Sequence, residues 1–150
     1  MSPAISFSDD SVAPVPHRAG PTLSPGLLDE AYRLAVCLVR NEQRAESLCE
    51  RAMRGLSVRR AGVSAALVRW SLLRRVLGEG RAEPVFAVPG DALAALGRLA
   101  PAEREVLALE IACDLTSSEC SALLRVSEGE VIRLRRDGRR ALASAARLAR

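Results

Sequence analysis

The 150-residue chain contains no lysine, a single histidine and few aromatic residues, which make up 3% of it. Because strands favour β-branched and aromatic side chains, a sequence dominated by alanine, leucine, arginine and glutamate predicts an all-α protein. The histidine, His17, lies in a proline-rich N-terminal stretch, and the sequence has neither a phosphate-binding loop nor a constellation of metal-ligating residues. We therefore expect a protein that is not an enzyme and that uses no cofactor, metal or small-molecule substrate.

The four cysteines, Cys37, Cys49, Cys113 and Cys120, have no metal-like spacing. Each falls on an apolar position of an expected helix, which predicts buried, reduced thiols. The N-terminus has no basic segment followed by an apolar stretch, and no apolar run approaches the length needed to cross a membrane. These features predict a cytoplasmic protein with no membrane partner.

The positive charge is concentrated at the C-terminus. The whole chain has a net charge of +4, and all 22 of its basic residues are arginine. Residues 127–150 carry seven of those arginines against three acidic residues, so this segment alone has a net charge of +4. A solvated helix face often looks like this, but clustering at one end of the chain favours an anionic partner.

Apolar periodicity divides the chain into two expected helical domains. Residues 1–26 hold five of the eight prolines, which predicts a disordered tail. Residues 27–77 predict a bundle of three amphipathic helices. Glycine and proline residues between 78 and 90 predict a linker, and residues 91–150 predict a second domain of four helices.

Two of these helices have apolar faces that the periodicity defines. The third helix of the first domain, 63–77, is expected to turn inward Val63, Ala66, Leu67, Trp70, Leu73 and Leu77, with Trp70 as the largest core side chain. In the second domain, Pro101 suits the first turn of a helix, because its missing N–H costs nothing there. That helix is expected to present Val106, Leu107, Ile111 and Ala112 to the core.

Two helix starts follow in quick succession in the second domain. Thr116 with Glu119 and Ser127 with Glu130 both fit the capping box, in which the hydroxyl and the glutamate satisfy each other's backbone amides. Between the two helix starts the sequence predicts a helix of about eight residues, followed by a turn at 125–127 in which Val126 would be buried. A short helix, a short turn and a basic helix form the layout of a helix-turn-helix.

The helix that follows Ser127 has an apolar rear and a basic front. Its inward positions are expected to be Val131, Leu134, Gly138, Ala141, Leu142 and Ala145. Arginines on such a front can fork onto guanine edges or bind phosphates. The DNA-binding candidates are Ser127, Glu130, Arg133, Arg136, Arg139 and Arg140. Arg135 lies beside the apolar face, where its stem would pack while its guanidinium reaches outward.

Residues 96–142 resemble region 4 of the sigma-70 family, in particular that of the small two-domain extracytoplasmic-function sigma factors. The matching positions are Leu99, Pro101, 104–107, Leu109, 114–116, Glu119, 124–127, Gly129, Val131 and Arg139, and the spacing holds without a gap over the 47 residues of 96–142. The resemblance implies that this domain recognises the upstream promoter element and that the chain acts in transcription initiation.

The N-terminal half resembles region 2 of the same family through 31–35 and 45–53. The resemblance implies that the second helix docks on the clamp of the RNA polymerase core, through Glu46, Ser47, Glu50, Arg51 and Arg54. At Arg51 the family usually carries an acidic residue.

Three interpretations remain open on the sequence. The chain is a sigma-like factor that binds promoter DNA and RNA polymerase, a stand-alone DNA-binding regulator that has lost polymerase docking, or a sigma mimic that binds an anti-sigma factor. The arginine-rich helix favours the first two, because a mimic needs no affinity for DNA.

Overall fold

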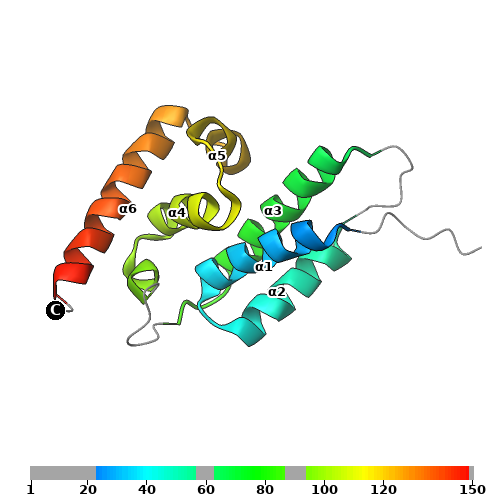
Figure 1. Ribbon diagram of the computed structural model, residues 1–150, viewed down its shortest axis with the longest axis horizontal. Coiled ribbons are helices and arrows are strands. Elements are labelled where there is room, and N and C mark those ends of the chain that lie inside the picture. The colour runs from blue at the N-terminus through cyan, green and yellow to red at the C-terminus, as the bar shows by residue number, and fades with distance from the viewer. Residues whose placement is uncertain (1–22, 57–62, 87–93, 149–150) are drawn as a thin grey trace, which may run out of the picture.

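The computed structural model describes residues 23–56, 63–86 and 94–148, and in this part of the chain every regular element is a helix (Figure 1). The helices are α1 (Pro25–Val39), α2 (Glu42–Arg54), α3 (Ala65–Arg81), the 3₁₀ helix η1 (Ala94–Arg98), α4 (Pro101–Cys113), α5 (Ser117–Leu124) and α6 (Glu128–Leu148). The all-α prediction is therefore confirmed. None of the described helices is both long enough and apolar enough to span a bilayer.

Side-chain caps determine where the first three helices begin. Ser24, Asn41 and Ser64 each accept a hydrogen bond from the backbone N–H three residues later, which satisfies one of the unpaired amides of a helix start. Because Ser24 caps α1 directly before Pro25, the helix begins two residues earlier than the periodicity predicted. Helix α3 ends later than predicted: it continues to Arg81, four residues into the stretch 78–90 that was predicted as a linker.

Helices α1, α2 and α3 pack against one another, but α3 uses a different face from the one predicted. Its buried residues are Leu72, Leu73, Val76 and Leu77. Leu67 is 56% exposed, Ala66 is exposed, and Val63 and Trp70 are only partly buried. The prediction was wrong for Ala66 and Leu67, because the start of α3 lies beside an open groove that it shares with the end of α2 and Ala122 of α5. Trp70 also lines this groove, but it packs against the core from its edge.

The C-terminal half packs directly onto the N-terminal half. Helix α4 lies against α1, and the buried apolar residues of both halves form one continuous cluster. Two arginines of α3 bridge the same junction: Arg69 Nη2 lies 2.5 Å from Glu30 Oε1 of α1 and donates to the carbonyl of Cys113, and Arg81 Nε lies 2.7 Å from Glu105 Oε1 of α4. Apolar packing and charged hydrogen bonds therefore hold the halves together.

The structure confirms the predicted burial of the cysteines but not that of Ile111 in α4. All four cysteines are buried free thiols, as predicted. Burial raises the pKa of Cys49 to about 11 and that of Cys113 to about 12, so both thiols are held in the neutral form. Ile111 is 50% exposed, against the prediction, because α4 buries the side that carries Val106, Leu109 and Cys113 against its neighbours.

Candidate nucleic-acid interface

Helix α5 begins with the predicted capping box. Thr116 Oγ1 accepts from the backbone N–H of Glu119 at 3.3 Å, and the Thr116 N–H donates to Glu119 Oε2 at 2.8 Å. The hydrogen bonds from the backbone and hydroxyl of Thr116 lower the pKa of the Glu119 carboxyl. Since an eight-residue helix is too short to be stable alone, this cap and the packing of its buried Cys120 and Leu123 determine where it forms.

The turn between α5 and α6 is built from a left-handed residue and two hydrogen bonds to Ser121. Arg125 caps α5 with a φ of 59°. The N–H of Val126 donates to the Ser121 carbonyl at 3.3 Å, and Ser121 Oγ donates to the Val126 carbonyl at 2.6 Å. This loop turns the Val126 side chain outward, where it is 37% exposed, so the prediction that it is buried was wrong.

Only half of the second predicted capping box is present. Ser127 Oγ accepts from the Glu130 N–H at 3.1 Å and so caps α6. The Glu130 carboxylate binds the guanidinium of Arg133 through Nη2 and Nε at 2.6 and 2.9 Å. The Glu130 carboxylate therefore pairs with an arginine on the outer face of α6, and the Ser127 side chain alone caps the helix.

The rear of α6 rests on α4 and α5, and its outer face lies at the edge of the molecule, away from α1, α2 and α3 (Figure 1). Val131, Leu134 and Gly138 are buried as predicted. A Cβ added at Gly138 would lie 2.8 Å from Leu107 Cδ1, so the glycine permits the close crossing of α6 over α4. Ala141 is exposed, against the prediction, while Leu142 and Ala145 are partly buried.

Four of the predicted DNA-binding arginines project from the outer face of α6, namely Arg133, Arg136, Arg139 and Arg140. Each of the first three meets a carboxylate: Arg133 lies between Glu130 and Asp137, Arg136 Nε is 3.3 Å from Asp137, and Arg139 contacts Glu110 of α4. The hydrogen bond to Glu130 is the main cause that raises the pKa of Arg133. Exposed ion pairs of this kind stabilise by about 0–1 kcal/mol, so a DNA phosphate can replace the carboxylate at little cost.

Arg135 has a structural position, as the sequence predicted. Its guanidinium donates to Ser117 Oγ at 2.9 Å and to the Leu115 carbonyl at 3.4 Å, and its Nε lies 3.2 Å from Glu110 Oε2. The side chain is only 19% exposed. Arg135 therefore joins α6 to α4 and to the start of α5, and it does not belong to the outer face.

The sequence did not single out two further residues of this surface. Ile132 is 54% exposed in the middle of the outer face, and Arg125 is exposed at the turn that precedes it. An apolar residue out of phase with the buried stripe was the available signal for Ile132. No sequence signal was available for Arg125, because its exposure follows from the left-handed backbone conformation that it adopts at the end of α5.

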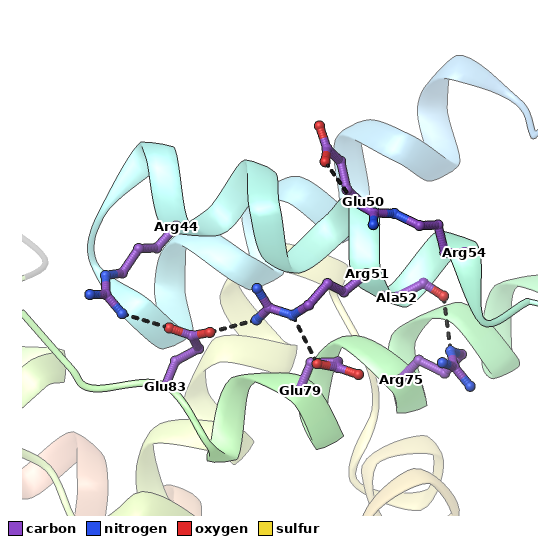
Figure 2. Close-up of polar contacts among 8 residues, drawn as sticks. All are labelled: Arg44, Glu50, Arg51, Ala52, Arg54, Arg75, Glu79 and Glu83. Atoms are coloured by element: carbon purple, nitrogen blue, oxygen red, sulfur yellow. Dashed lines mark hydrogen bonds and ion pairs between the residues drawn. The ribbon is translucent and has the colours of Figure 1, made fainter.

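The polymerase-docking candidates all lie on α2, and Figure 2 shows Glu50, Arg51 and Arg54 among them. Glu46 and Ser47 are exposed, and Glu50 pairs with Arg54 one turn later at 3.1 Å. Arg51 instead reaches Glu79, in the last turn of α3, and Glu83, just beyond that helix, with Nε 3.0 Å from Glu79 and Nη2 2.5 Å from Glu83. These hydrogen bonds raise its pKa, and Arg44 completes the group by pairing with Glu83 at 2.9 Å.

Comparison of the chain with protein-family models, with curated proteins and with solved structures finds no match.

Proposed function

We propose that the chain is a sigma-factor-like transcription regulator that binds promoter DNA through α5 and α6. The observation that carries the proposal is the outer face of α6, where exposed arginines follow a short capped helix and a three-residue turn. This is the arrangement in which the second helix of a helix-turn-helix enters the major groove and its first residues contact base edges. The rear of α6 is fixed on α4 by Val131, Leu134 and Gly138, so the arginines project from a rigid support.

The DNA-binding candidates divide by role. Of the three ion-paired arginines on the outer face of α6, Arg136 has the most exposed side chain, at 65%, so we assign it to a base edge. Arg133, Arg139 and Arg140 flank it and suit phosphates, which position the helix without reading sequence. Ser127 and Glu130 lie at the start of α6, where the amides favour a phosphate and the carboxylate orients Arg133.

A stand-alone DNA-binding regulator is the second candidate, and two observations favour it. The Arg51 guanidinium, on the helix expected to dock on polymerase, is already occupied by Glu79 and Glu83. The two halves, which are the two domains that the resemblance implies, also share one core. The promoter elements that sigma regions 2 and 4 contact lie on the order of 50 Å apart, so a sigma factor of this sequence has to separate its halves on polymerase.

One experiment separates these functions. The full chain is mixed with RNA polymerase core for co-purification, and its binding to DNA selected from a random library is measured with and without core at two salt concentrations. Binding to both polymerase and DNA supports the sigma-like function, and binding to DNA alone supports the stand-alone regulator. If three or four arginines meet phosphates, log K should fall against log salt with a slope of about −3 to −4. Failure to bind DNA under either condition would refute the proposal and leave the sigma mimic.

A further inference from the structure

Ile132 is a large apolar side chain on the basic outer face of α6. It is 54% exposed, whereas the neighbouring Val131 is fully buried. Because an α-helix has 3.6 residues per turn, Ile132 shares its face with Arg136, one turn later, and with Gly129, just under one turn earlier. Single exposed apolar residues are common on proteins. What distinguishes Ile132 is its place among arginines, on the part of the helix that a helix-turn-helix inserts into the major groove.

Gly129 adds an independent observation at the same place. A Cβ added there would meet only Ser127 Oγ, at 4.0 Å, so nothing within the fold requires a glycine. Gly129 is the second residue of α6 and is exposed, at a point where a glycine weakens the helix less than in its middle. The missing side chain leaves the backbone bare beside Ile132, which lets this part of α6 approach another surface closely.

The chemistry of the major groove identifies what an isoleucine can recognise there. Guanine, adenine and cytosine present hydrogen-bonding groups, whereas thymine adds a C5 methyl that makes apolar contacts. We propose that Ile132 contacts the C5 methyl of a thymine and thereby selects thymine at one position of the DNA site. The proposal rests on the proposed DNA-binding function and assigns it a specificity-determining residue.

Arg136 gives the proposed thymine an expected neighbour. Four helical residues rise ~6 Å along the axis, and successive base pairs are about 3.4 Å apart. With α6 lying along the groove, the base contacted by Arg136 is about two base pairs from the thymine. Because a bidentate arginine prefers guanine, the site is expected to hold a guanine at that distance.

Replacement of thymine by deoxyuridine tests the contact, because it removes only the methyl group. A DNA site is first selected from a random library with the full chain, in the presence and in the absence of RNA polymerase core. Each thymine of that site is then replaced in turn. One replacement is expected to weaken binding about fourfold, the factor that corresponds to one buried methyl group. Ile132→Ala is expected to weaken binding to the thymine site and to bind the thymine and uracil forms equally well.

Ile111→Ala is the matched control, since Ile111 is 50% exposed but lies on α4, outside the outer face of α6. It should keep the parent's preference for thymine over uracil, and circular dichroism should report the same helix content for both variants. If no single replacement affects binding, or if Ile132→Ala keeps the thymine preference, the proposal is wrong while DNA binding stands. If no DNA is selected under either condition, the proposed function fails and this proposal fails with it.

Discussion

Gly138 lies where α6 crosses α4, and its replacement by alanine probes the support behind the outer face. The added Cβ would lie 2.8 Å from Leu107 Cδ1 and 3.4 Å from Glu103 Cβ. Leu107 is 2% exposed, so its side chain has little room to move. Overpacking of this kind costs about 1–3 kcal/mol, whereas removal of a helical glycine gains about 0.5–1 kcal/mol. Gly138→Ala is therefore expected to lower the free energy of unfolding by about 1 kcal/mol.

Gly129→Ala is the matched control, because it makes the same change in the same helix at a position with open space. It should leave stability unchanged or raise it by up to about 1 kcal/mol. A difference of about 1–3 kcal/mol between the two variants would report overpacking at the α4–α6 crossing, because the loss of a glycine in the middle of the helix would by itself stabilise Gly138→Ala. Urea unfolding followed by circular dichroism measures both variants. If they unfold at the same urea concentration, the close crossing at Gly138 is wrong.

Three further predictions concern stability, acid dependence and thiol reactivity. Thr116→Ala removes the α5 cap and should destabilise the protein by about 0.5–2 kcal/mol in urea unfolding, and an unchanged midpoint would argue against the capping box. Because the folded-state pKa of Glu119 is lowered, its contribution is present above the ordinary glutamate pKa of about 4.3 and is lost as pH falls through the folded-state value. Glu119→Gln should accordingly flatten the acid limb of a stability-against-pH curve, and a limb as steep as the parent's would contradict this. Since Cys49 and Cys113 have pKa values of about 11 and about 12, a thiol reagent at pH 8 should modify them only on unfolding, and rapid labelling of the native protein would show that they are accessible.

The sequence predicted features that depend on local chemistry. The capping box at Thr116, the turn after Leu124 and the inward position of Gly138 follow from residues within one or two turns of each other, and the structure contains all three. The partly buried, structural position of Arg135 was also predictable, because Arg135 lies next to the apolar stripe of its own helix.

Features that depend on distant neighbours were not predictable in this way. Periodicity identifies an apolar stripe but does not say how much of it another helix covers, which is why Leu67, Ile111 and Ala141 proved exposed. The pairing of Arg51 with Glu79 and Glu83 joins residues about 30 positions apart. The packing of α4 on α1 likewise unites segments that local patterns treat as separate domains.

The DNA-binding role of α6 is tested most directly by removing one arginine from its outer face. The affinity of full-length Arg136→Ala for the selected DNA is compared with that of Arg74→Ala, which removes an exposed arginine from α3. Circular dichroism checks that both variants are folded. We expect Arg136→Ala to lose about 1–3 kcal/mol, or roughly 5- to 150-fold in affinity, while Arg74→Ala binds as the parent does. Equal affinity of the two variants would contradict the assignment of α6 as the helix that reads DNA.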